Sequence, residues 1–536
     1  MSVFEWFKSL GNAKMRMDYE IPEVDMPYHD EEYYGHIPVY AHHYSFNRPV
    51  QYKDLYCRAF MPPVTTLPAV APVESRANDK ACVKYRIEKV RNRKRIPQKW
   101  RGWCTQWVNG MVDRIGMLEP WDRDRVLDKM PKKDRAENIR RRDYIKDCLP
   151  SEEEIRTFQK RETYATINAP RNISPVSDSQ LLESSTFTYP LYEALKHSWC
   201  RWWGPGKSPS ATAEQVALLT EAGCFGADYS KFDGHQNRGL RHQVFRVLRE
   251  VFPAHRNGCK RWYDIELRAT GKTRFGVTYD LDGTMPSGSA FTTIGNTLLN
   301  SLVFYLAFRL NGSQDPFRDM DEGCILYGDD SVGLESVKSA FFTVCEELGI
   351  AAGEEDSTFG TSFLGRIYPF QGDPYSFCDP RRMLSKLHTT TAHMGFTIEQ
   401  AACNKAHGVL AMCEHEPWIS RICNAILRAY GNLDVKHEAL THSEKYLLEH
   451  MVGYSTDHPR IAEVWDIVAE MGDISTSFLM EVMESYDMVK SDWREFPNAW
   501  YGPKGAEHFN KFEEEVYLAC HSPAGMVQWK VEKKKQ

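Results

Sequence analysis

The sequence predicts a mixed α+β fold, and three observations support this prediction. Residues 324–334 read as two short strands joined by a tight turn, because strand-forming side chains flank Gly328 and Asp329 on both sides. From Ser289 to about Phe308 a near-continuous apolar pattern is typical of a long buried helix. Helical patterns then dominate the chain from about residue 390. With 536 residues, 42% of them hydrophobic, the chain is long enough for several subdomains.

The predicted turn carries two adjacent acidic residues, Asp329 and Asp330. Their like charges repel each other, and no basic residue stands next to them in the sequence. About a hundred residues upstream, Asp228 follows another short run of strand-forming residues. Carboxylates brought together from two strand ends form an oxygen-ligand site for hard divalent cations. A Gly-Asp-Asp tripeptide alone is more often an ordinary acidic turn, so this interpretation depends on the other segments.

Between these acids, a loop leads into the long apolar helix. Pro286 and Gly288 mark the loop, and Ser287 stands between them. Thr292 and Asn296 are four residues apart, so they share one face of the helix. A hydroxyl and an amide on one face suit recognition of a sugar edge. Capping by hydroxyls at a Ser- and Thr-rich helix start is the alternative interpretation.

In their order and spacing, these segments resemble the palm of RNA-dependent RNA polymerases from positive-strand RNA viruses. The resemblance covers roughly residues 155–390, and its last segment resembles the strand-turn-strand that grips the growing primer end. The matching segments are, in order, Asp228 to Asp233, Ser287-Gly288 with Thr292 and Asn296, Gly328-Asp329-Asp330, and Thr361 to Tyr368. Within that group the chain is most similar to nodavirus replicases, and tombusvirus-like enzymes come next.

The resemblance implies a right-hand polymerase, with fingers, a palm made of an antiparallel sheet plus helices, and a mainly helical thumb. The expected boundaries are an N-terminal extended arm in 1–80, fingers in 81–225 and 241–285, palm in 226–240 and 286–390, a thumb in 391–515 and a C-terminal tail in 516–536. The arm is inferred from its Pro- and Tyr-rich composition. Thr397 and Gln400 form a capping-box pattern at the first helix of the expected thumb.

The resemblance also implies the reaction and its metal ions. Asp228, Asp329 and Asp330 match the family's metal-binding and catalytic acids. We therefore expect two Mg²⁺ or Mn²⁺ ions at this site. They would serve transfer of a nucleotide from a nucleoside triphosphate to an RNA 3′-hydroxyl, on an RNA template, in the replication of a viral RNA genome.

A second group of residues is expected to bind the nucleoside triphosphate. Lysine as a point charge and arginine as a fork suit the triphosphate, and an acceptor beside an amide suits the ribose 2′-hydroxyl. The expected nucleotide-binding residues are Lys160, Arg171, Asp233, Ser287, Gly288, Thr292 and Asn296. Glu162 is expected to hold the cationic segment around Lys160 by an ion pair.

Two other functions stay open at this point. Tyr327 to Asp330 also fits the signature of reverse transcriptases. That family places a bulky aromatic residue five positions after the first palm aspartate, where this chain has Asp233. An acceptor there can satisfy a 2′-hydroxyl, which favours ribonucleotides. A non-catalytic RNA-binding or scaffold protein is the second alternative, and the intact aspartates argue against it.

Charge and composition bear on the expected partners. The formal net charge of −6 means that affinity for RNA template and product must come from local patches. One such patch is the basic stretch from Lys84 to Arg101, in which Trp100 is interleaved and after which Trp103 follows. It fits a groove that follows an RNA backbone, with a solvated helix face as the alternative. Other viral replication proteins and host membranes are further expected partners.

Cysteine usage points to a reducing compartment. The 14 cysteines include no Cys-x-x-Cys pair, and no signal peptide is recognised. Together with the resemblance to viral polymerases, this implies the host cell cytoplasm, at membrane-associated replication sites. No run approaches the ~20 apolar residues of a transmembrane helix, so no transmembrane segment is expected. Cys403 with His407, and Cys413 with His415, leave a zinc site open, although such residues on helices usually belong to the core or the surface.

Overall fold

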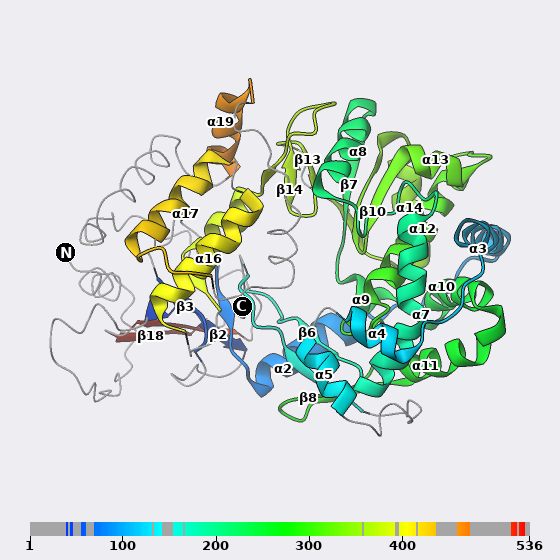
Figure 1. Cartoon of the computed structure of the whole chain (residues 1–536), viewed down its shortest axis with the longest axis horizontal. Coiled ribbons are helices and arrows are strands. Elements are labelled where there is room, and N and C mark those ends of the chain that lie inside the picture. Colours follow the sequence, from blue (N-terminus) through cyan, green and yellow to red (C-terminus); the bar gives the residue numbers. More distant parts are fainter. Residues whose placement is uncertain are drawn as a thin grey trace, which may run out of the picture. The chain divides into compact units, whose positions relative to one another are not determined.

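The computed structural model combines helices and strands, as the sequence predicted (Figure 1). It describes residues 39–40, 43–46, 55–60, 69–130, 133–141, 154–164, 167–355, 358–391, 396–413, 416–435, 458–471, 516–522 and 525–530. The chain divides into two compact units. The central unit comprises Cys82–Gln159 and Arg171–Ser376. The terminal unit comprises Met1–Ala81, Lys160–Pro170 and Phe377–Gln536.

An antiparallel sheet in the central unit carries the acidic turn. Its strand order is β10-β11-β7-β12. The strands are β10 (Cys324–Tyr327), β11 (Asp330–Leu334), β7 (Cys224–Tyr229) and β12 (Ala352–Glu354). Tyr327 pairs with Asp330, which leaves Gly328 and Asp329 as a two-residue loop. Gly328 has a φ of 65°, a conformation that glycine adopts without steric cost. The hairpin predicted over residues 324–334 is confirmed.

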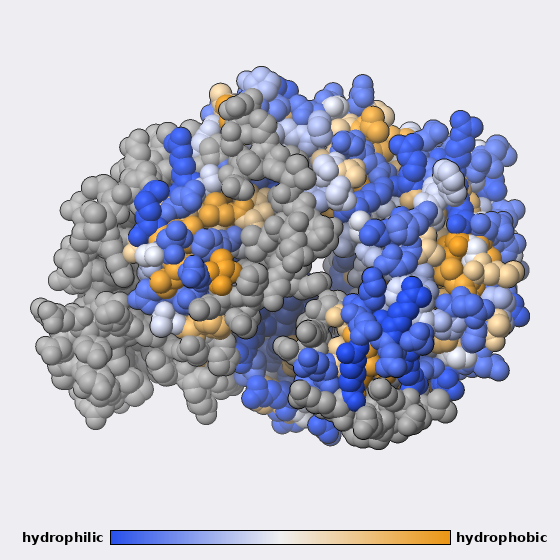
Figure 2. Space-filling view, in the orientation of Figure 1, coloured by the Kyte–Doolittle hydropathy of each residue, from blue (hydrophilic) through white to orange (hydrophobic). Residues whose placement is uncertain are grey.

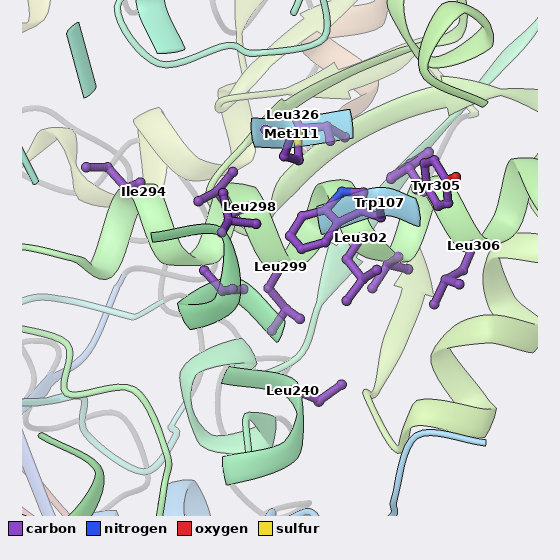
Figure 3. Packing of buried hydrophobic residues seen from close by; sticks show 14 of the residues in the cluster. Trp107, Met111, Leu240, Ile294, Leu298, Leu299, Leu302, Tyr305, Leu306 and Leu326 are labelled. Carbon is purple, nitrogen blue, oxygen red and sulfur yellow. The ribbon is translucent and has the colours of Figure 1, made fainter. Parts of the chain in front are cut away.

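The core of the central unit surrounds the helix α12 (Thr292–Leu310). Every residue of this helix from Ile294 to Phe308 is buried, as expected for a helix that is apolar on all sides. Figure 3 shows Leu298 and Leu302 of α12 in one cluster with Trp107 and Met111. The packed neighbours are α3 (Arg101–Ile115), α10 (Arg238–Val251), α13 (Pro316–Gly323) and α14 (Lys338–Leu348). The predicted buried helix is therefore confirmed, and it begins three residues later than the apolar pattern.

Further elements of the central unit surround this core. A second sheet has the order β6-β5-β8-β9. Its strands are β5 (Ile155–Gln159), β6 (Asn172–Ile173), β8 (Thr270–Thr273) and β9 (Thr278–Asp280). The remaining helices are α4 (Arg123–Lys129), α5 (Lys133–Arg141), α7 (Asp178–His197), α8 (Pro209–Ala222), α9 (Phe232–His235) and α11 (Arg256–Arg268).

The strand-turn-strand predicted from Thr361 to Tyr368 is also present. β13 (Thr361–Phe363) and β14 (Arg366–Tyr368) form an antiparallel pair. The two loop residues, Leu364 and Gly365, both have positive φ, at 53° and 76°. Two positive φ values in a two-residue loop match the twist of a hairpin. Leucine is an unusual residue at such a position, and its side chain is exposed.

The terminal unit joins segments from both ends of the chain. One sheet has the order β18-β17-β2-β4, and β1, β3 and β16 form another. Its strands are β1 (Val39–Tyr40), β2 (His43–Phe46), β3 (Arg58–Ala59), β4 (Ala71–Pro72), β16 (Thr389–Thr390), β17 (Val516–Ser522) and β18 (Gly525–Lys530). Parts of the expected arm and of the expected tail are thus paired in one sheet, through β2 and β17. Composition alone does not reveal such long-range pairing.

Helices follow in the terminal unit, and the first of them lies within the segment 286–390 that was expected to be palm, ahead of the predicted helical region. They are α15 (Pro380–Leu387), α16 (Ile398–Cys413), α17 (Pro417–Ala429) and α19 (Ile461–Met471), while α2 (Arg76–Val83) precedes them in the chain. The Gln400 N–H donates to Thr397 Oγ1 at 3.2 Å, so the predicted cap of α16 is confirmed. Within the region after residue 390 that the sequence predicts as helical, residues 440–451 and 478–489 also carry helical patterns, but they lie outside the described residues.

The described surface shown in Figure 2 is mostly hydrophilic, and hydrophobic residues show in several separate areas. Of the helices within the described ranges, none is both long and apolar enough to cross a bilayer.

Candidate active site

The end of the palm-like sheet brings carboxylates together. Asp228 in β7 pairs directly with Asp330 in β11, and Asp329 lies in the adjoining loop. Directly paired residues of antiparallel strands point to the same face, with Cβ atoms about 4.5–5.5 Å apart. On the other side of β7, Asp228 is paired with Gly353, which adds no side chain. All three aspartates are exposed, so the sheet presents them to solvent at one end.

The electrostatics of this end of the sheet are unfavourable without a cation. Burial raises the pKa of Asp228, and the charge of Asp329 raises it further. Three oxygen donors of like charge suit hard divalent ions such as Mg²⁺ or Mn²⁺. The oxygens of the three carboxylates do not all lie within 4.8 Å of one another. The chemistry of the donor set nevertheless fits a divalent-cation site.

Asp233 reaches the same region through a sharp change of chain direction. Lys231 adopts a left-handed φ of 53° just before the short helix α9, which contains Asp233. Asn296 Nδ2 donates to Asp233 Oδ1 at 2.8 Å. Gln236 Nε2 in turn donates to Asn296 Oδ1 at 2.6 Å, which fixes the orientation of the buried amide. Gln236 is a site residue that the sequence pattern did not single out.

Other predicted nucleotide-binding residues lie around Asp233. Burial raises the pKa of Asp233, and the charge of Asp329 acts in the same direction. Hydrogen bonds with Asn296 and Ser287 and the guanidinium of Arg171 oppose that rise in pKa. Asn296, Ser287 and Arg171 therefore each act on the Asp233 carboxylate.

Gly288 and Thr292 shape the loop from within. A Cβ on Gly288 would lie 2.7 Å from Pro175 Cα, so only glycine allows the loop to approach that backbone. The Thr292 hydroxyl lies 3.0 Å from the carbonyl oxygen of Ser289 and 3.1 Å from that of Pro286, to which it donates. In this structure the Thr292 hydroxyl therefore braces the loop, and its expected role in nucleotide binding stays a prediction.

Lys160 belongs to the terminal unit, unlike the other predicted nucleotide-binding residues. Its Nζ forms an ion pair with Glu162 at 3.0 Å, as the sequence predicted. The side chain of Lys160 is 42% exposed, which leaves it accessible to a ligand.

Two buried residues of α12 hold the acidic turn, and the sequence analysis missed both. The Gly328 N–H donates to Thr297 Oγ1 at 2.8 Å, and Asn300 Nδ2 donates to the Gly328 carbonyl at 3.2 Å. Tyr229 Oη donates to Asn300 Oδ1 at 2.9 Å, which links β7 to the same network. The available signal was the presence of polar residues inside a helix that is otherwise apolar on all sides.

We expect Thr297→Val to lower kcat for nucleotide addition and to leave KM almost unchanged. The variant keeps the side-chain shape but leaves the buried Gly328 N–H without its acceptor, at a cost of about 1–3 kcal/mol. The loop that carries Asp329 is then held by Asn300 alone. Steady-state kinetics would test this, with Thr293→Val on an exposed position of the same helix as control. A lowered kcat in the control as well would contradict the assignment.

A buried ion pair anchors the loop that carries Ser287 and Gly288. Arg241 Nη2 lies 3.0 Å from Glu266 Oε2, and both side chains are almost fully buried. Arg241 Nη1 also donates to the Thr284 carbonyl at 3.1 Å, while Ser289 Oγ donates to Glu266 Oε1 at 2.6 Å. The pair thus holds both ends of the segment 284–289. Burial raises the pKa of Glu266, and Arg241 and Ser289 oppose that rise.

The zinc site left open by the sequence does not form at Cys403 and His407 among the described residues. The Cys403 thiol instead lies 3.9 Å from the Tyr430 carbonyl. Within the described ranges, the thiols of Cys378 and Cys413 and the Glu416 carboxylate do lie within 4.8 Å of one another. Both oxygens of Glu416 accept the Cys378 N–H at 3.0 Å. His415 lies outside the described residues.

Comparisons with known proteins identify relatives of this chain. The chain is 32% identical over 402 residues to the RNA-directed RNA polymerase of Pariacoto virus, covering 72% of this chain and 40% of that protein. It is 32% identical over 400 residues to that of Striped jack nervous necrosis virus, with coverages of 71% and 39%. It is 29% identical over 304 residues to that of Macrobrachium rosenbergii nodavirus, with coverages of 52% and 28%. The chain thus spans about two fifths of the length of the first two relatives.

A solved structure shares the fold. The insertion loop deletion mutant of the RNA-dependent RNA polymerase of a human picorbirnavirus aligns with a TM-score of 0.52 at 12% identity. The alignment covers 76% of this chain and 82% of that one, which supports the predicted right-hand polymerase fold. Residues 194–377 match the family model described as viral RNA-dependent RNA polymerase. Over residues 194–377 the chain is therefore similar to the viral RNA-dependent RNA polymerase family, and the resemblance to nodavirus replicases is confirmed.

Proposed function

We propose that this chain synthesises RNA on an RNA template, by nucleotidyl transfer from nucleoside triphosphates to an RNA 3′-hydroxyl, and so replicates a viral RNA genome. The observation that carries the proposal is the pairing of Asp228 with Asp330, beside Asp329, at the end of one sheet. The hydrogen-bonded pair of Asp233 and Asn296 lies within electrostatic range of Asp329. Similarity to the family supports the same reaction.

The aspartates have distinct roles in this proposal. Asp228 and Asp329 hold Mg²⁺ or Mn²⁺, and Asp330 assists them from the paired position on β11. Two such ions, when bound, supply positive charge for the attacking and leaving oxygens of the transfer. The chain itself contributes a turn whose position is fixed by Thr297 and Asn300, so that little reorganisation is needed during the reaction.

The residues around Asp233 receive the nucleotide. Asp233 supplies an acceptor and Asn296 a second N–H for the ribose 2′-hydroxyl, because only one N–H of the amide is needed for their mutual bond. The exposed Arg171 contacts the triphosphate as a fork. For Lys160, which belongs to the terminal unit, triphosphate binding stays a prediction. Ser287 is exposed on the loop that Gly288 and Thr292 shape, and it borders the sugar.

We expect Asn296→Ala to narrow the preference for ribonucleotides over deoxyribonucleotides by roughly ten-fold or more in kcat/KM. Loss of the amide leaves the ribose hydroxyl with one partner fewer, and an unpaired buried polar group costs about 1–3 kcal/mol. Deoxyribonucleotide incorporation should change much less. Single-nucleotide addition with matched ribo- and deoxyribo-substrates measures both values in one variant. An equal loss for both sugars would show that Asn296 only supports the loop.

A direct assay distinguishes this function from its two alternatives. The full chain, supplied with an RNA template and labelled ribonucleotides, should incorporate label with Mg²⁺ or Mn²⁺ and lose this activity when a chelator is added. A preference for deoxyribonucleotides would indicate a reverse transcriptase. RNA binding without metal-dependent incorporation by the folded chain would indicate a scaffold protein.

We further propose that the chain works in the host cell cytoplasm, at membrane-associated replication sites, with other viral replication proteins or host membranes as partners. The cysteines within the described ranges are free thiols, which suits a reducing compartment. Imaging of a tagged full chain in infected cells, together with double-stranded RNA, tests the location. A tag found in the lumen of the secretory pathway would contradict it.

A further inference from the structure

The central unit contains a hollow of about 830 Å³ with a strongly basic lining, here called the basic hollow. Its basic residues form two walls, one from the segment before α3 and the start of α3, the other from α10. They are Arg93, Lys94, Arg95 and Arg101 on the first wall, and Arg238, His242 and Arg246 on the second. Asp282 is the one carboxylate among the described lining residues. None of the palm aspartates lines this hollow.

The α10 wall is a straight row of two arginines with a histidine between them, and burial lowers the pKa of that histidine. Arg238, His242 and Arg246 are spaced four residues apart, so they share one face of the helix. At about 1.5 Å per residue, the row is roughly 12 Å long. The segment 93–101 supplies the other wall of the same hollow. An elongated site with two charged walls suits an extended anionic chain better than a single phosphate.

Most of the basic side chains in this lining have no acidic partner among the residues that the structure describes. Within the described parts of the chain, no carboxylate forms an ion pair with Arg93, Arg95, Arg101 or Arg246. Arg246 instead donates to the neutral side chains of Gln243 and Thr105, at 2.9 and 3.1 Å. Arg238 differs, since it lies 3.3 Å from Asp282. The positive charge of the hollow is therefore largely uncompensated.

The basic segment is fixed in place before any ligand binds. Asn92 Nδ2 donates to the carbonyls of His235 and Leu348, at 3.0 and 2.8 Å. Asn237 Nδ2 donates to the Lys94 carbonyl at 3.0 Å, which ties the segment to the start of α10. His235 follows Asp233 by two residues, so the basic hollow adjoins the backbone of a motif that reaches the active site. Fixed charges lose little conformational freedom on binding.

We infer that the basic hollow binds consecutive phosphates of an RNA strand without reading its bases. The described lining includes no Phe, Tyr or Trp on which a base would stack. Its apolar members are few, namely Ile96, Cys104 and Leu267. Arginine and lysine contacts to the backbone supply affinity that is independent of sequence and sensitive to salt. This inference rests on the proposed function, because it assigns a path for the RNA strand of that reaction.

The test is the salt dependence of RNA affinity in a variant that lacks three arginines of the first wall, here called the wall variant. Arg93, Arg95 and Arg101 are exposed, so Arg93→Ala/Arg95→Ala/Arg101→Ala should fold normally. The probe is a short labelled single-stranded RNA of mixed sequence, titrated with the full chain between about 50 and 200 mM salt. The slope of log K against log salt should fall by about 0.7 for each lost phosphate contact, so by roughly two for the triple variant. An unchanged slope overturns the inference.

The matched control removes the same charge elsewhere on the central unit. Arg256→Ala/Lys260→Ala/Arg318→Ala alters three exposed cations that lie outside the hollow and pair with acids. The slope of this control should stay close to that of the unaltered chain. A slope reduced as much as in the wall variant would show a general charge effect and overturn the inference. Arg246→Gln provides a second variant from the opposite wall, with an expected reduction of about 0.7.

Two further experiments distinguish a failure of the RNA-site inference from a failure of the proposed function. Asp329→Asn in the full chain should keep the salt slope of RNA binding, because Asp329 lies outside the hollow. A chain that binds RNA through the hollow but adds no nucleotide would refute the proposed function and leave the RNA site standing. Titration with a free ribonucleoside triphosphate tests a small-anion site instead. If the wall variant loses affinity for the triphosphate and keeps the slope for RNA, the inference is wrong.

Discussion

Asp329→Asn should lower RNA synthesis by several orders of magnitude while the protein stays folded. The change keeps the size of the side chain but removes a ligand charge from the turn between β10 and β11. It also removes the repulsion that raises the pKa of Asp228, so the sheet should lose no stability. Metal-dependent nucleotide incorporation, together with thermal unfolding, measures both effects.

Asp280→Asn is the matched control for that variant. Asp280 is exposed at the end of β9, and its carboxylate is not part of the site. Synthesis should continue at the normal rate in this variant. Near-normal elongation by well-folded Asp329→Asn protein would remove the basis for the metal assignment.

Arg241→Ala should destabilise the central unit by about 3–5 kcal/mol, because it leaves Glu266 buried without a compensating charge. Activity should fall further than stability alone explains, since the Thr284 carbonyl loses its donor and Glu266, which accepts from Ser289, loses its partner. Chemical denaturation followed by tryptophan fluorescence measures the first effect. Arg249→Ala is the control, because its partly exposed pair with Glu250 contributes at most about 1 kcal/mol.

A double variant separates stability from positioning in the same network. In Arg241→Met/Glu266→Met, two apolar side chains of similar length replace the buried charges, which is often neutral for stability. We expect stability to recover while nucleotide addition stays impaired, because Ser289 still lacks its acceptor. Full recovery of activity would mean that the pair serves only the core.

The parts of the fold that the sequence predicted well are those with a strong local pattern. The hairpin at 324–334 has strand formers on both sides of a Gly-Asp turn, and α12 has a long apolar run. The cap of α16 by Thr397 depends on a pattern of four residues. Pairing between β2 and β17 has no local pattern, because it joins residues more than 450 positions apart. The prediction of an extended arm and a tail from composition therefore gave no sign of this pairing.

In the candidate site too, residues in local motifs were predicted, and residues that act through distant contacts were not. The motifs identified Asp228, Asp329 and Asp330, and the structure places them at one end of a sheet. The supporting residues were missed because their importance depends on contacts far away in the sequence. Arg241 did carry a signal, since it precedes Val244 and Phe245 by three and four residues on the buried face of α10. An arginine at such a position indicates a buried partner.

The order of strands in the catalytic sheet has a consequence for synthesis of the protein on the ribosome. β7 lies between β11 and β12, and both partners follow it by about 100 residues or more. At about 5–20 residues per second, translation needs roughly 5–20 seconds to supply the first of them. Until then both edges of β7 are open to pairing with other chains. The catalytic centre is therefore completed late, and chaperones that shield the nascent chain over this interval should raise the yield of active protein.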